Sequence, residues 1–208
     1  MQQTRILCLC LGILLAPLAS AQESIVVRDA LQGLLNMSAQ QCKQADTRMA
    51  QQKEKMELPM RLALEDGQGT LCRCVPEKVR GLLKTLPADV LDRRVTSQEE
   101  LLAIVRPKAL DPCTAEQLRR PYSYRCEDRF KSTSIDVHKY CGCMKSVVNA
   151  IPEHEATEMG FASAAYIPRA AEAKRKGEPE PARPAALNRL FTADANCKTA
   201  SQLAKPKN

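Results

Sequence analysis

Hydrophobic residues recur along this chain mostly at the three- and four-residue spacing of an α-helix. Val27, Leu31 and Leu34 show the pattern near the beginning, and Val75 and Val79 repeat it further along. Residues at these spacings meet on one side of a helix and form a common apolar face. No alternation of apolar and polar residues extends beyond a few positions. The pattern therefore predicts an all-α fold.

Local signals place several ends of the predicted helices. Ser97 and Glu100 have the spacing of a capping box, in which each side chain bonds the backbone N–H of the other residue. The segment 65–69 contains two glycines and predicts a loop. Asp111 followed by Pro112 predicts a break between helices, because proline lacks the backbone N–H that continues a helix.

The first 21 residues have the pattern of a secretory signal peptide. Arg5 supplies a positive charge, residues 6–18 form an apolar run, and the small residues 19–21 form a cleavage site. The run is shorter than the roughly 20 residues that a membrane-spanning helix needs, and no later stretch is apolar enough to span a bilayer. We therefore expect cleavage after Ala21 and a mature protein in the periplasm or outside the cell.

Eight cysteines follow the predicted signal peptide in two sets, each with one cysteine, a Cys-x-Cys pair and a fourth cysteine. The first set is Cys42, Cys72, Cys74 and Cys113, and the second is Cys126, Cys141, Cys143 and Cys197. Apolar residues follow both Cys-x-Cys pairs at the same distances. The sequence therefore predicts two tandem modules, 22–120 and 121–208, each a helical hairpin stapled by disulfides.

The location predicted for the protein bears on how these cysteines pair. An oxidising compartment outside the cytoplasm favours disulfides over free thiols. Two residues that are two positions apart on a helix point in directions that differ by about 200°, so each Cys-x-Cys pair is expected to split. One of its cysteines would bond the first cysteine of the set and the other the fourth. The sequence leaves open which cysteine takes which partner.

A soft-metal site is the alternative interpretation of the second Cys-x-Cys pair. His138 lies three residues before Cys141 and five before Cys143, and imidazole together with thiolates suits copper or zinc. However, structural zinc sites usually space their cysteines more widely, and export favours disulfides. We therefore predict no metal and no cofactor, with His138, Cys141 and Cys143 as the alternative ligands.

Basic residues suggest where a partner binds. The net charge is +7, or +6 without Arg5. Segment 174–184 combines a basic triplet with three prolines, a composition that predicts an exposed, extended loop, and a helix is expected to restart near Ala185. We hypothesise that this loop contacts a protein partner with acidic side chains, since basic surfaces attract such partners. The partner-binding residues predicted in this way are Lys174, Arg175 and Lys176. The alternative is an inert insertion, because surface loops accept extra length at little cost.

No recognisable catalytic motif appears in the sequence, and we predict a protein without catalytic activity. The expected function is that of an exported, disulfide-stabilised protein-binding protein, such as an inhibitor, an immunity protein or an envelope assembly factor. One alternative is the soft-metal carrier, and another is a binder of anionic envelope components through the basic surface. Nucleic acid is not expected as a partner, because export separates the protein from it and only 3% of the residues are aromatic.

Overall fold

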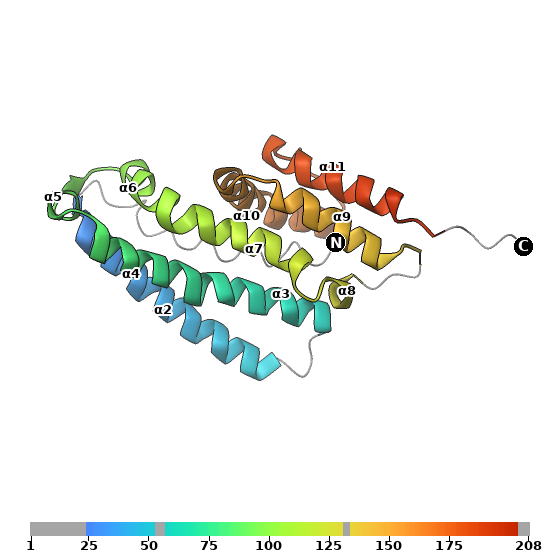
Figure 1. The fold of residues 1–208 in the computed structure, drawn as a ribbon, viewed down its shortest axis with the longest axis horizontal. Helices are drawn as coiled ribbons and strands as arrows, with labels where there is room; N and C mark the ends of the chain where they lie inside the picture. Colours follow the sequence, from blue (N-terminus) through green and yellow to red (C-terminus); the bar gives the residue numbers. More distant parts are fainter. Residues whose placement is uncertain (1–23, 53–56, 131–133, 204–208) are drawn as a thin grey trace, which may run out of the picture.

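The computed structural model describes residues 24–52, 57–130 and 134–203 (Figure 1). The described chain is almost entirely helical, as the apolar spacing predicts. Two residues of β1 (Ile25–Val26) pair antiparallel with β2 (Arg94–Val95), and an isolated antiparallel bridge joins Ile135 to Gln202. The predicted signal peptide lies outside the described residues. No helix in the described part of the chain has the length and apolar character needed to cross a bilayer.

The N-terminal part of the fold consists of two long helices that lie side by side. Helix α2 (Val27–Gln52) packs against a second helix formed without a break by α3 (Leu58–Gly69), the π-helical segment η3 (Thr70–Cys74) and α4 (Val75–Thr85). The loop predicted at 65–69 is therefore wrong. Its glycines remain helical because the surrounding turns are held by tertiary contacts, which outweigh the low helix propensity of glycine.

One of these tertiary contacts is a buried ion pair that the Asp66 carboxylate forms with two arginines. The Asp66 carboxylate of α3 lies 2.7 Å from Nε of Arg120 and 2.8 Å from Nη1 of Arg129. Arg129 is buried and also donates from Nε to the carbonyl of Tyr124 at 3.1 Å. Burial raises the pKa of Asp66, while the charges of Arg129 and Arg120 act in the opposite direction. The pair ties α3 to elements more than 50 residues further along the chain.

The next part of the chain returns as another continuous helix. After the short α5 (Ala88–Leu91), helix α6 (Gln98–Val105) leads through the π-helical segment η4 (Arg106–Leu110) into α7 (Asp111–Ser123). The capping box at the start of α6 is confirmed in part. The Ser97 hydroxyl accepts from the Glu100 N–H, while the Glu100 carboxylate accepts from the N–H of Thr96.

The predicted break at Pro112 is also wrong, and both π-helical segments show why. The N–H of Asp111 bonds the carbonyl of Arg106, five residues back, and Pro112 follows directly. In the same way, the N–H of Val75, just after η3, bonds the carbonyl of Thr70, five residues back, and Pro76 follows directly. Where the bonding changes from the five-residue spacing of a π-helical turn back to four, one carbonyl has no N–H partner. Proline has no backbone N–H to donate, so it can occupy the position that would otherwise supply this partner. The helix can therefore continue through each proline.

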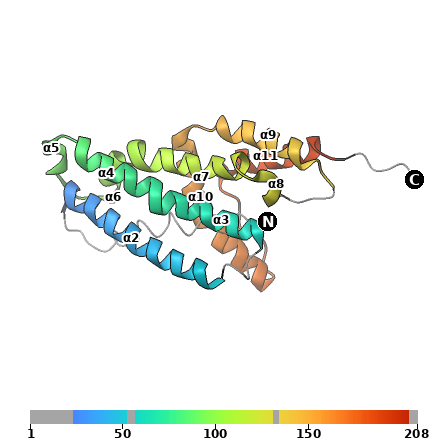
Figure 2. The ribbon, with the colours of Figure 1, turned by 60° about the horizontal axis from the view of Figure 1, so that its bottom comes forward.

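Four helices complete the fold: α8 (Cys126–Arg129), α9 (Val137–Asn149), α10 (Glu153–Lys176) and α11 (Ala185–Ala200). Figures 1 and 2 show α7 in the middle of the molecule, between the α3–α4 helix and α9. Helix α10 packs on α7, and α11 packs on α9 and α10. The last helix begins at residue 185, where the sequence predicts a helix to restart.

Two hydrophobic clusters form the core, and they divide along the chain within α7. One cluster runs from Val27 to Cys113, and the other begins at Ala115 and ends at Cys197. The predicted module boundary at 120/121 falls inside α7, which spans Asp111–Ser123. The two parts of the core therefore share one helix. We refer to residues 24–113 as the N-terminal half and to residues 126–203 as the C-terminal half.

Candidate partner-binding site

The eight cysteines form four disulfides, each within one of the two sets. They join Cys42 to Cys72, Cys74 to Cys113, Cys126 to Cys141, and Cys143 to Cys197, with Cα–Cα separations of 5.5–6.0 Å. The predicted split of each Cys-x-Cys pair is thus present. The structure also decides what the sequence left open: in both sets the first cysteine of the pair bonds backward and the second bonds forward.

This pairing removes the thiolates from the alternative metal site. Cys141 and Cys143 belong to different disulfides, and a disulfide sulfur is not the thiolate that binds copper or zinc. His138 is exposed, and its Nδ1 lies 2.9 Å from Oε1 of Glu127. That hydrogen bond raises the pKa of His138. Within the described residues, no group of His, Cys, Asp and Glu side chains is arranged to hold a metal ion.

The predicted basic loop at 174–184 needs a correction at its beginning. Lys174, Arg175 and Lys176 are exposed, but they form the last turn of α10. Gly177 ends the helix with φ of 70°, a left-handed conformation that glycine adopts without steric cost. Cations at the end of a helix interact favourably with its dipole, which explains why this triplet continues α10.

The remaining proline-rich segment, 178–184, is extended but attached at several points. The Glu178 N–H bonds the Ala173 carbonyl at 2.9 Å. The Tyr166 hydroxyl donates to Oε1 of Glu180, and this hydrogen bond raises the pKa of Tyr166. Further along, the Arg183 guanidinium lies 3.9 Å from the ring centroid of Phe191 on α11. The segment is therefore held between α10 and α11.

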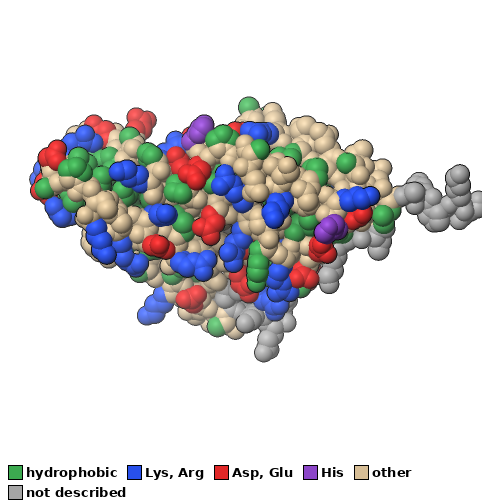
Figure 3. Space-filling view, in the orientation of Figure 1, with side chains coloured by type: hydrophobic (Ala, Val, Ile, Leu, Met, Phe, Trp, Pro, Cys, Tyr) green, Lys and Arg blue, Asp and Glu red, His purple; other side chains and the backbone are tan. Residues whose placement is uncertain are grey.

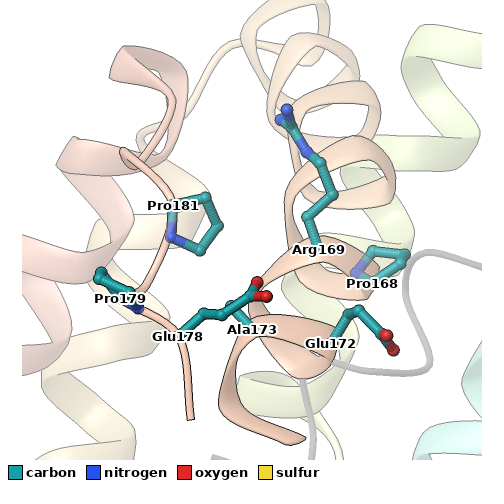
Figure 4. A pocket seen from close by; sticks show the side chains of 7 residues that line it. All are labelled: Pro168, Arg169, Glu172, Ala173, Glu178, Pro179 and Pro181. Carbon is teal, nitrogen blue, oxygen red and sulfur yellow. The ribbon is translucent and has the colours of Figure 1, made fainter. Parts of the chain in front are cut away.

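An open pocket of about 570 Å³ lies between this segment and α10 (Figure 4). In Figure 4, Pro179 and Pro181 form one wall, and Pro168 and Arg169 of α10 form the other. We call this site the proline pocket. Its lining residues are Pro168, Arg169, Glu172, Ala173, Glu178, Pro179 and Pro181.

Charges of both signs surround the proline pocket. Glu172 pairs with Arg175 at 2.6 Å and with Lys176 at 3.3 Å, one turn further along α10. Lys174 takes part in none of the ion pairs found among the described residues. The pocket therefore combines proline rings, which offer rigid apolar surface, with an exposed basic turn at its edge.

Sequence reasoning located the basic turn and the prolines of the loop, but it missed the opposite wall. Pro168 and Arg169 lie inside a helix-forming stretch, and nothing in their local pattern indicates a pocket. A proline in the interior of a helix is uncommon, and this was the one available signal.

The adjacent arginines Arg119 and Arg120 have structural roles. Arg119 donates from Nη2 to the Ile151 carbonyl at 2.8 Å and from Nε to the Val148 carbonyl at 3.4 Å, near the end of α9. Its neighbour Arg120 forms the buried ion pair with Asp66. These two cations therefore satisfy groups of the protein itself.

Comparisons of the chain with protein-family models, with curated proteins and with solved structures find no match.

Proposed function

We propose that this chain is an exported protein that binds another protein through the proline pocket and the basic turn beside it. Two features support export, namely the signal-peptide pattern of residues 1–21 and the four disulfides, which are typical of oxidising compartments. In this proposal the protein acts by binding and has no catalytic step of its own. An inhibitor, an immunity protein and an assembly factor all fit such a role.

The observation that carries the proposal is that the pocket wall is attached on both sides. Segment 178–184 contacts α10 through Glu180 and Tyr166, and it contacts α11 through Arg183 and Phe191. The disulfide between Cys143 and Cys197 further ties α11 to α9. A surface that is ordered before binding loses less conformational entropy when a partner arrives. The proline pocket is therefore suited to specific binding.

The basic turn indicates the charge of the proposed partner. Lys174, next to the lining residue Ala173, is exposed and takes part in none of the ion pairs of the described chain, so a partner carboxylate would meet positive charge there. Such rim charges mainly speed association and suppress wrong partners. We therefore propose a partner with acidic side chains around an apolar contact.

Site-specific cross-linking tests the location of the binding surface. A photo-reactive amino acid at Arg169, on the pocket wall, is expected to capture the partner in cells that make the full-length protein. The same amino acid at Lys145, an exposed position on α9, serves as the matched control. Equal capture from both positions would contradict the proposed site.

Affinity for the partner identified in this way provides the second measurement. Replacing Lys174, Arg175 and Lys176 together by Ala is expected to weaken binding about 3- to 100-fold, from roughly 0.2–1 kcal/mol per exposed charge pair. The control is a variant with Ala at Lys108, Lys139 and Lys145, which removes the same charge elsewhere. Equal affinities in the two variants would count against a role for the basic turn.

A further inference from the structure

A row of cations runs along the outer side of the continuous α3–α4 helix, away from the proline pocket. Its members are Arg73, Arg80 and Lys84, and all three are exposed. Figure 3 shows Lys and Arg side chains gathered on the face over this helix. We call Arg73, Arg80 and Lys84 the cation row.

Helix geometry explains why these three side chains line up. Arg80 follows Arg73 by seven residues and Lys84 follows Arg80 by four, which is about two turns and then one turn at 3.6 residues per turn. The rise of roughly 1.5 Å per residue places them about 10 Å and 6 Å apart along the axis. The opposite side of the same helix is buried, with Val79 and Leu82 in the core. The cation row therefore points outward.

The charges of the row are not neutralised by the protein itself. None of the ion pairs in the described part of the chain includes Arg73, Arg80 or Lys84. By contrast, cations elsewhere often meet a carboxylate, as Arg106 does with Glu158 at 2.7 Å. Positive charge that is lined up and unpaired produces a local potential that attracts anions.

We infer that the cation row binds a linear polyanion, a chain molecule with regularly repeated carboxylate, sulfate or phosphate groups. The one-dimensional arrangement supports this choice. Helix α2 packs beside α4, and the exposed charges described on it balance, with Arg28 and Lys43 against Asp29 and Asp46. Net positive charge is therefore concentrated along one of these two helices, which matches a chain better than the broad plane of a membrane.

The scarcity of exposed apolar groups also favours a chain over a lipid surface. Among the described residues, the large hydrophobic side chains that are exposed are Tyr124 and Leu203, and neither lies on the α3–α4 helix. Proteins that lie on a bilayer usually insert apolar side chains beside their basic ones. Binding by the cation row is therefore electrostatic and weakens as salt increases.

Glu77 provides an internal test of this inference. It is exposed on the same side of the helix, four residues after Arg73 and three before Arg80. No ion pair found in the described chain includes it. If a polyanion lies along the row, the Glu77 carboxylate opposes it, so removal of that charge is expected to tighten binding.

The experiment measures binding of defined heparin chains to the mature full-length protein by calorimetry at low and at physiological salt. The row variant carries Arg73→Gln, Arg80→Gln and Lys84→Gln, and the control variant carries Lys108→Gln, Lys139→Gln and Lys145→Gln. The row variant removes three cations and is expected to bind on the order of 100-fold more weakly, from the usual contribution of a cation near an anionic surface. The control variant is expected to change by less than about threefold, and Glu77→Gln is expected to bind more tightly. Circular dichroism and melting verify that each variant folds.

Several outcomes would overturn the inference. Equal losses in the row and control variants would assign binding to net charge alone, and weaker binding by Glu77→Gln would exclude the row as the contact. Tighter binding to phosphatidylglycerol vesicles than to heparin would replace the chain with a membrane as partner. The inference is independent of the proline pocket, so the row variant is expected to retain its affinity for the protein partner.

Discussion

The two halves of the molecule share a disulfide pattern but differ in the chemistry of their cores. In both halves the Cys-x-Cys pair bonds backward through its first cysteine and forward through its second. All four Tyr and all three Phe, however, lie after residue 121. The N-terminal cluster therefore consists of aliphatic side chains and cysteine, whereas the C-terminal cluster includes Tyr140 and Tyr166. Similar disulfide frameworks can thus enclose different cores.

The helices that carry the two Cys-x-Cys pairs differ as well. Cys72 and Cys74 lie in the π-helical segment of a helix that continues on both sides, whereas Cys141 and Cys143 lie in the regular helix α9. Aromatic side chains contribute the largest buried area per residue. The N-terminal half, which has none, is therefore expected to depend more on its disulfides.

The largest expected effect comes from removing one disulfide in each half. Replacing Cys74 and Cys113 by Ala is expected to lower the free energy of unfolding by about 4–5 kcal/mol, toward the upper end of the usual range for a native disulfide. The same change at Cys143 and Cys197 is expected to cost about 2–3 kcal/mol, because aromatic packing holds the helices there. Urea unfolding measures both. A larger loss of stability in the C-terminal half than in the N-terminal half would contradict the expected dependence of the N-terminal half on its disulfides.

The second largest loss of stability is expected from breaking the buried ion pair between the halves. Asp66→Asn leaves the buried Arg129 without its carboxylate, and the expected loss is about 3–4 kcal/mol. Because Asp66 joins α3 to α7 and α8, separate unfolding transitions of the two halves are also expected in calorimetry. Asp46→Asn, at an exposed position on α2, is the control and is expected to stay within about 0.5 kcal/mol. A single unchanged transition in Asp66→Asn would show that this pair does not couple the halves.

A smaller effect tests the aromatic cluster of the C-terminal half. The buried Tyr140 hydroxyl donates to Oδ1 of Asp194 at 2.6 Å, and burial raises the pKa of the adjacent Tyr122 to about 12. Tyr140→Phe loses a hydrogen bond to a charged group, so the expected cost is about 1.5–3 kcal/mol. Tyr124→Phe, at a half-exposed ring, is expected to change stability by less than about 0.5 kcal/mol. Chemical denaturation distinguishes the two variants, and equal stabilities would show that the hydrogen bond between Tyr140 and Asp194 does not stabilise the fold.

The smallest effect concerns pH. The hydrogen bond to Glu127 raises the pKa of His138 above its value of about 6.5 in the unfolded chain. The resulting stabilisation is therefore fully present below about pH 6.5 and is lost as pH rises through the folded-state pKa. His138→Gln is expected to flatten this part of the stability profile, while His154→Gln serves as the control. Unfolding midpoints between pH 5.5 and 8.5 measure it, and identical profiles for wild type and His138→Gln would refute the assignment.

Local reasoning succeeded where one segment contains all the information. The helical apolar spacing, the Ser97 cap and the restart of a helix at residue 185 are each confirmed. It failed at segment 65–69, at Pro112 and at residues 174–176, where it predicted loops or a break and the structure has helix. In the first of these, a contact with residues far along the chain outweighs a local preference for a turn.

The candidate binding surfaces show the same difference between features set by local sequence and features set by the fold. The basic triplet is visible as a run in the sequence, whereas the cation row is not, because its members are four and seven residues apart and align only when the segment is helical. The pocket wall at Pro168 and Arg169 gave no local signal beyond a proline inside a helix-forming stretch.

That the chain is helical and that each Cys-x-Cys pair divides between two disulfides could be predicted from the sequence, because both follow from the geometry of a single helix. The disulfide partners, the helix shared by the two halves and the proline pocket became known from the three-dimensional structure. These features depend on which distant segments pack together. Asp66 with Arg120 and Arg129, and Glu180 with Tyr166, are contacts that no local pattern specifies.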